Sequence, residues 1–162
     1  MPTIFSHPAV ALVLPRRLAV AAAILAILPD ADVLGFALHI PYGSTFGHRG
    51  FTHSILFAAV TALVATLLLR ADAKAFAILF ACALSHGVLD AMTDGGRGIA
   101  FFSPFSNARY FFPWRPIRVS PIGGVRLSVL KSELLWIWVP AVALAILRIA
   151  LRAKSSDQET AG

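Results

Sequence analysis

The strongest constraint on the fold is a run of nineteen residues, 51–69, that contains no charged side chain. A helix of that length measures about 28 Å, close to the thickness of a bilayer's hydrocarbon core. Residues 73–92 and 134–151 are nearly as apolar. Because backbone polar groups inside a membrane must be satisfied within their own segment, these three stretches predict transmembrane helices.

A fourth apolar segment, residues 18–28, is too short to cross a membrane by itself. It could span if residues 15–17 begin it and residues 33–40 continue it beyond Pro29, or it could be re-entrant. The sequence therefore predicts an all-α fold, a polytopic transmembrane helical bundle with about three or four membrane helices. Residues 93–131, rich in glycine, proline and aromatic side chains, are expected to form a long interfacial loop.

Composition supports the membrane class. Hydrophobic residues make up 58% of the 162 residues and charged residues only 14%, too few to coat a soluble domain of this size. We expect one membrane-embedded domain over residues 1–153 and a disordered polar tail over residues 154–162. The net charge of +6 favours contacts with lipid headgroups. The basic residues form no run, so nucleic-acid binding is not expected.

Histidine and aspartate residues interrupt the apolar sequence at spacings typical of metal ligands. His86 and Asp90 are four residues apart on an expected helix and share one face, although a His–Asp hydrogen bond between helices is an alternative. His48 and His53 can converge only if His48 lies in the loop of residues 47–50 and His53 in the first helical turn. The predicted metal ligands are His7, Asp30, Asp32, His48, His53, His86 and Asp90.

Chain direction is expected to bring these side chains to one membrane face. Residues 51–69 and 73–92 are joined by a short turn and should form an antiparallel hairpin, with their histidines at the same end. Asp30 and Asp32 follow the preceding apolar segment and can reach that end, unless either simply caps a helix. His7 can reach it only if the residues before Pro15 cross partway back.

The donor types indicate which metal could bind. Imidazole and carboxylate without thiolate favour zinc, with manganese or iron as alternatives, and seven donors suit two ions. A carboxylate near the ions is expected to orient or deprotonate a water molecule, and Asp32, Asp94 and Glu133 are the candidates for this catalytic role. Arg109 and Arg115, in the long loop, are predicted to contact a phosphate group, although lipid headgroup contacts are an equal alternative.

The motifs that carry these residues resemble those of the YdjM-type family of membrane-bound metal-dependent hydrolases. They are Ser-His-Pro at 6–8, Leu-Pro-Asp-Ala-Asp at 28–32, His-Arg-Gly-Phe-Thr-His-Ser at 48–54, Ser-His-Gly-Val-Leu-Asp at 85–90, and the stretches 93–105 and 109–116. This pattern is distantly similar to the zinc-dependent phospholipase C superfamily, whose members hydrolyse phosphate esters. The resemblance implies a location in the bacterial inner membrane. It also implies these ligands: His7, Asp30 or Asp32, His48 or His53, His86 and Asp90.

Together these features predict a metal-dependent hydrolase that cleaves a phosphoester of a lipid or lipid-linked molecule with a metal-activated water. Its expected partners are membrane lipids. Two alternatives stay open. In the first, the protein is not an enzyme and a closed metal site is purely structural. In the second, it transports divalent ions, and its ligands lie in the middle of the membrane.

Overall fold

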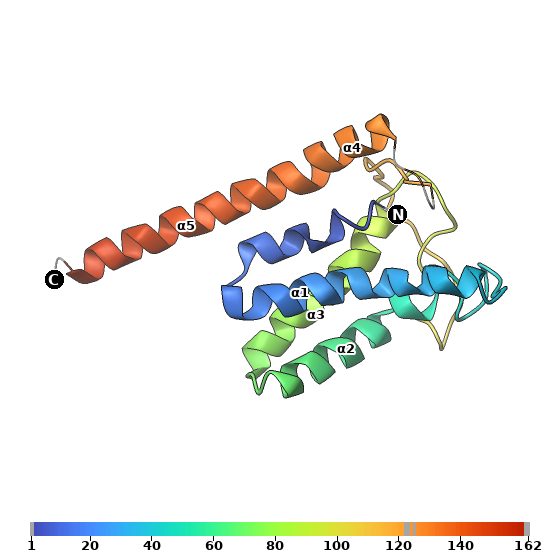
Figure 1. Ribbon diagram of the computed structural model, residues 1–162, viewed down its shortest axis with the longest axis horizontal. Helices are drawn as coiled ribbons and strands as arrows, with labels where there is room; N and C mark the ends of the chain where they lie inside the picture. The colour runs from blue at the N-terminus through green and yellow to red at the C-terminus, as the bar shows by residue number, and fades with distance from the viewer. Residues whose placement is uncertain (1, 122–123, 125, 161–162) are drawn as a thin grey trace.

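The protein is built from helices and connecting loops in the computed structural model, which describes residues 2–121, 124 and 126–160 (Figure 1). The described residues form no β-strand, only two isolated bridges within the long loop and its flanks. The all-α helical bundle predicted from the sequence is therefore confirmed. The elements are η1 (His7–Val13), α1 (Arg16–Ile27), η2 (Leu28–Phe36), η3 (Phe51–His53), α2 (Ile55–Leu68), α3 (Ala73–Ala91), α4 (Leu127–Glu133), η4 (Leu134–Trp138) and α5 (Val139–Thr160).

The N-terminal segment doubles back on itself. The 3₁₀ helix η1 and helix α1 lie side by side in opposite directions, joined at Pro15 (Figure 1). Pro15 has an extended backbone, which its ring permits, and it directly precedes the first helical residue. The seven residues of η1 cover about 14 Å at the 3₁₀ rise. This is the backward crossing that the sequence required, and it begins at His7 itself.

The first membrane-length segment continues through a proline. Helix α1 passes directly into the 3₁₀ helix η2, in which Pro29 occupies one of the first two positions, where its missing N–H is tolerated. The combined segment Arg16–Phe36 has 21 residues and is apolar enough to cross a membrane. Of the two alternatives left open by the sequence, the structure shows the continuous one, and the segment ends at Phe36.

Helix α2 is shorter than the sequence predicted. Residues Phe51–His53 form a separate 3₁₀ turn, and the Ser54 side chain accepts a hydrogen bond from the Phe57 N–H (3.0 Å), which caps α2. The fourteen residues of α2 measure about 21 Å, less than a hydrocarbon core. The prediction that residues 51–69 form one membrane-length helix was therefore wrong. Within the described part of the chain, the three candidate spans are Arg16–Phe36, Ala73–Ala91 and Leu127–Lys154.

Helices α1, α2 and α3 pack through small side chains. Their shared core consists of four alanines, one cysteine and two leucines: Ala22, Leu25, Ala58, Ala62, Leu79, Cys82 and Ala83. Small residues let helix backbones approach closely, which is how helices associate where lipid removes the hydrophobic driving force. This close packing fixes the position of α3 relative to the end of α1.

The C-terminal rod, α4–η4–α5, contacts the bundle mainly at its start and then extends away from it (Figure 1). Only 6% of its membrane-length window is buried within the protein, which suits a helix surrounded by lipid. Helix α5 continues to Thr160, through most of the tail for which the sequence predicts disorder.

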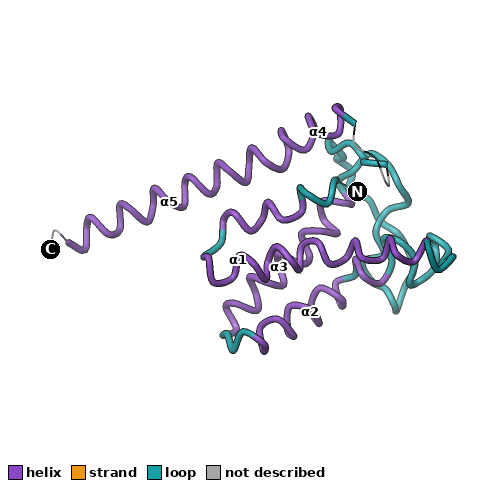
Figure 2. The backbone as a smooth tube through the Cα atoms, in the orientation of Figure 1, coloured by secondary structure: helices purple, strands orange, loops and turns teal. Residues whose placement is uncertain are grey.

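The loops gather at one end of the bundle, where η2 ends, α2 begins and α3 ends (Figure 2). The long connection between α3 and α4 is fastened there by backbone hydrogen bonds. The Ala100 N–H donates to the Arg49 carbonyl (3.1 Å), and the Ile55 N–H donates to the Phe101 carbonyl (3.0 Å). These contacts place the long loop over the end of the bundle at which the predicted ligands lie.

Candidate metal centre

Five of the seven predicted ligands meet inside the protein at this end of the bundle. Each side chain is at most 3% exposed. They come from four segments that are distant in the chain: η1, η2, η3 and α3. In order they are His7, Asp30, His53, His86 and Asp90.

The nitrogens of two histidines point at each other. His86 Nδ1 lies 2.7 Å from the Ala26 carbonyl oxygen, to which it donates, so His86 Nε2 carries the lone pair. His53 Nδ1 lies 3.2 Å from Asp32 Oδ2, and the two Nε2 atoms are 3.0 Å apart. Two lone pairs at that separation repel, so a proton or a cation must lie between them. This point is the natural centre of the cluster.

Two carboxylates surround the same point. Asp30 Oδ1 is 3.4 Å from His86 Nε2 and 3.8 Å from His53 Nε2, and Asp90 Oδ2 is 3.5 Å from His53 Nε2. The donors of a tetrahedral zinc site, with bonds of about 2.0–2.1 Å, lie about 3.3 Å apart. The observed spacing of the four donors fits one ion of this size.

The remaining oxygens of the same carboxylates face His7. Its Nε2 lies 3.8 Å from Asp90 Oδ1 and 4.0 Å from Asp30 Oδ2. Among the described residues, neither ring nitrogen of His7 and neither oxygen of Asp30 makes a hydrogen bond. Buried polar atoms without hydrogen bonds are costly, so these donors suit a bound cation. Asp30 and Asp90 could each bridge two ions, one on each side.

Two histidines of the cluster, His7 and His53, lie outside the membrane-length segments and have shifted pKa values. Burial lowers the pKa of His7 to about 3, helped by the nearby His86 ring, so His7 is neutral as a metal ligand must be. Burial also lowers the pKa of His53, but its hydrogen bonds to Asp32 and Asp90 outweigh burial and raise the pKa to about 9. This shift favours the protonated form of His53 when no metal is bound.

Asp32 and His48 form an adjacent group that shares His53. Asp32 Oδ1 lies 2.6 Å from His48 Nδ1. Asp32 Oδ2 accepts hydrogen bonds from the Arg49 N–H (3.0 Å) and the Thr52 hydroxyl (2.8 Å). His48 does lie in the loop before the helix, as predicted, but His53 lies in the 3₁₀ turn η3 and not in the first turn of α2. Because Asp32 is hydrogen-bonded through both oxygens, it is better placed to orient the two histidines than to bind an ion itself.

Arg49 is a site residue that the sequence analysis did not single out. Its side chain is 1% exposed, and its Nε lies 3.1 Å from Asp90 Oδ2. Its two terminal nitrogens donate to the Gly95 carbonyl (2.9 Å) and the Thr93 hydroxyl (3.2 Å). A Cβ at Gly96 would lie 2.4 Å from the guanidinium, so only glycine fits there. The guanidinium offsets part of the negative charge that the three aspartates bring to the site.

Two of the three predicted catalytic carboxylates belong to other contacts. Asp94 accepts hydrogen bonds from Arg118 Nη1 (2.9 Å) and the Val119 N–H (2.8 Å) in the long loop. Glu133 is buried, and it accepts hydrogen bonds from the Thr3 N–H and from hydroxyls of Thr3 and Ser6. Neither carboxylate lies among the converging donors described above or in the Asp32–His48 pair, which favours structural roles for both.

The two arginines predicted to contact phosphate lie in different surroundings. Arg109 is half-buried and donates to several backbone carbonyls, including those of Tyr42 (3.0 Å) and His48 (3.1 Å). Burial lowers its pKa. Arg109 therefore ties the long loop to residues 42–49. Arg115 is exposed and stacks over the Phe111 ring at 4.9 Å. The prediction of a phosphate contact fits the exposed Arg115 better.

Fold and site together define a helical membrane protein with a buried histidine–aspartate cluster at one end of its bundle. The chain belongs to the YdjM inner membrane protein family, which it matches over residues 3–155. It is similar to the inner membrane protein YbcI of Escherichia coli (strain K12), with 42% identity over 164 aligned positions that cover 89% of this chain and 95% of YbcI. No solved structure matches the chain.

These comparisons confirm two expectations from the sequence, namely the YdjM resemblance and a location in the inner membrane. The distant similarity to the phospholipase C superfamily stays a prediction. The ligand and catalytic roles of individual residues also stay predictions.

Proposed function

We propose that this protein is a membrane-bound metal-dependent hydrolase that cleaves a phosphoester of a lipid or lipid-linked molecule. The observation that carries the proposal is the pair of facing Nε2 atoms of His53 and His86, 3.0 Å apart, with oxygens of Asp30 and Asp90 around them. The side chains of His7 and Asp30 make no hydrogen bond to any residue that the structure describes, and buried donors that converge in this way suit divalent cations well.

The donor set suits two ions that share both carboxylates. His53 and His86 would hold one ion and His7 the other, with Asp30 and Asp90 between them. Nitrogen and oxygen donors without sulfur favour zinc, with manganese or iron as alternatives. When bound, such a pair supplies an acidified water as nucleophile and positive charge that stabilises a phosphoryl transition state.

The protein's own groups would hold and move the proton. Of the three carboxylates predicted to act on water, only Asp32 lies against the donors. His48 Nδ1 donates to Asp32 Oδ1, which leaves His48 Nε2 as the basic atom of this pair. We assign the proton-accepting role to this His48–Asp32 pair, with Asp32 orienting the ring and stabilising its charged form. An exposed arginine such as Arg115 would attract the phosphate group.

A purely structural metal site is the second candidate, and the burial of all five donors favours it. Closed sites with protein ligands only are typical of structural zinc. The transporter alternative expects ligands in the middle of the membrane. It fits less well, because Asp90 lies one residue before the end of α3 and His53 precedes α2.

The experiment that tests the proposal starts from protein purified in detergent, stripped with a chelator and reloaded with zinc. Elemental analysis should count two ions per chain, and the loaded protein should hydrolyse a generic phosphodiester. His86→Asn should abolish binding of at least one ion and all hydrolysis. His39→Asn is the matched control, because His39 is exposed and has a positive φ that asparagine tolerates.

The outcomes separate the candidates. Bound ions without hydrolysis of the phosphodiester would favour the structural site. Metal-dependent flux of ions into liposomes would favour the transporter. Hydrolysis that survives complete removal of metal would refute the proposed mechanism.

A further inference from the structure

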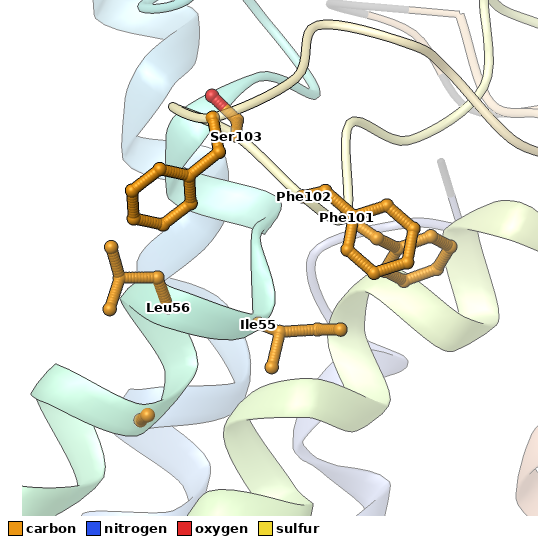
Figure 3. A pocket seen from close by; sticks show the side chains of 7 residues that line it. Ile55, Leu56, Phe101, Phe102 and Ser103 are labelled. Atoms are coloured by element: carbon orange, nitrogen blue, oxygen red, sulfur yellow. The ribbon is translucent and has the colours of Figure 1, made fainter.

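An apolar groove of about 450 Å³ lies between the first turn of α2 and the long loop (Figure 3). This volume is within the range of roughly 300–1,000 Å³ that is usual for ligand pockets. The groove is lined by Ile55, Leu56 and Ala59 of α2 and by Phe101, Phe102, Phe105 and the fully buried Ser103 of the loop. Its walls offer no polar surface to a ligand. This lining suits a hydrocarbon occupant.

One wall of the groove packs against the histidine–aspartate cluster. Ile55, two residues after His53, donates its N–H to the Phe101 carbonyl (3.0 Å). Gly87, the residue after His86, lies against both His53 and Phe101. A Cβ there would be 3.1 Å from the His53 carbonyl oxygen and 3.3 Å from the Phe101 ring. The glycine lets the groove wall contact the backbone that carries both facing histidines.

The groove is open to the lipid. Ile55 and Leu56 are each 37% exposed, and Phe102 is 52% exposed. The outward face of α2 continues from them as exposed apolar side chains, among them Val60 and Leu63. In an inner membrane protein such a face contacts acyl chains. The groove therefore opens onto the lipid-facing surface on one side, and on the other side its wall packs against the backbone of the buried cluster.

We infer that the groove holds one acyl chain of the membrane lipid whose phosphoester the cluster cleaves. The inference rests on the proposed function and narrows its substrate to a lipid with a hydrocarbon chain beside the scissile phosphate. Along α2 the groove spans only one turn, from Ile55 to Ala59, about 6 Å. A partner helix, about 10 Å wide, is too large for this space.

The binding test uses the full-length protein in vesicles of phosphatidylethanolamine and phosphatidylglycerol that contain a phosphatidylglycerol with a photoreactive diazirine on one acyl chain. Crosslinks at Leu56 and Phe105 should exceed those at Ile146, on the exposed surface of α5, by about fivefold. Ala59→Trp fills the groove and should remove the excess. Ala143→Trp, which places the same bulk on the exposed surface of α5, should keep it.

A second variant guards against misfolding of the first. Phe102→Ala removes a half-exposed wall of the groove without adding bulk, and it should also remove the excess of crosslinks. Equal crosslinking at α2 and α5, unchanged in both groove variants, would overturn the inference. So would weaker labelling at Leu56 and Phe105 than at Ile146, the result expected if a second copy of the protein covers the groove.

The activity test compares two probes with zinc-loaded protein: long-chain phosphatidylglycerol and glycerophosphoglycerol, its headgroup without acyl chains. Ala59→Trp should lower the ratio of long-chain to headgroup hydrolysis about tenfold, because the chain loses its site. An unchanged ratio would overturn the inference. If the wild type hydrolyses neither probe while the crosslinks remain, the proposed function fails and the groove stands as a lipid site only.

Discussion

Glu133 is expected to hold His7 in place, although it lies outside the donor groups. Its carboxylate accepts hydrogen bonds from the Thr3 N–H, the Thr3 hydroxyl (2.7 Å) and the Ser6 hydroxyl (2.7 Å). Ser6 directly precedes His7, and its hydroxyl also accepts a hydrogen bond from the Trp138 indole N–H (3.0 Å). The buried carboxylate thus fastens the N-terminal segment to the C-terminal rod.

Glu133→Gln preserves the shape of the side chain but removes its charge. Both hydroxyls donate to the same oxygen, Oε2, so an amide nitrogen there would leave them without their acceptor. Hydrogen bonds to a charged group contribute about 1.5–3 kcal/mol each, and the rotating hydroxyls recover part of the loss, so we expect a net cost of roughly 2–3 kcal/mol. If this loss of stability detaches the N-terminal segment from the C-terminal rod, zinc affinity should fall by about ten- to a hundredfold, because His7 is no longer held in place.

The assay is a zinc titration against a competing chelator, combined with hydrogen exchange of the N-terminal residues. Asp94→Asn is the matched control, because Asp94 also accepts two hydrogen bonds, both from the long loop, and is not among the converging donors. It should leave zinc affinity unchanged. Wild-type zinc affinity in Glu133→Gln, together with faster exchange at Thr3 and Ser6, would show that His7 does not depend on this tether and would refute the reasoning.

Three further predictions follow from the packing and the charges. Arg49→Met leaves the buried Asp90 carboxylate without its guanidinium neighbour and should cost about 3–5 kcal/mol of the free energy of unfolding, measured by denaturant titration in detergent. An unchanged midpoint would contradict this. Ala62→Leu inserts bulk where α2 packs at 0% exposure and should cost about 1–3 kcal/mol, whereas Leu63→Ala on the exposed face should cost little. Removal of metal with a chelator should lower Tm, because ions that bind only the folded state stabilise it; a Tm independent of zinc concentration would argue against a metal site.

The meeting of the ligands could be predicted because it depends on local spacing and chain direction. His86 and Asp90 share a face of α3, and a short turn returns α3 to the end at which His53 lies. The start of α2 was predicted wrongly because Phe51 is as apolar as the helix that follows. The capping serine at position 54 was the available signal for the true start.

The partners of individual charged groups could not be predicted, because they depend on contacts between distant segments. Nothing in the sequence near Glu133 indicates that it binds Thr3 and Ser6. Arg49 looked like one more basic loop residue, yet it is buried against Asp90 and reaches Gly95. Such roles follow from how η1, the loop before η3 and the long loop pack together.

The hydrogen bond between His86 and the Ala26 carbonyl has a consequence for Pro29. In the 3₁₀ pattern of η2, the N–H that would pair with this carbonyl belongs to residue 29, and proline has none. The ring of Pro29 thus keeps the Ala26 carbonyl available for the imidazole of His86, 60 positions after Ala26 in the chain. A residue usually regarded as a helix breaker here selects the tautomer of His86.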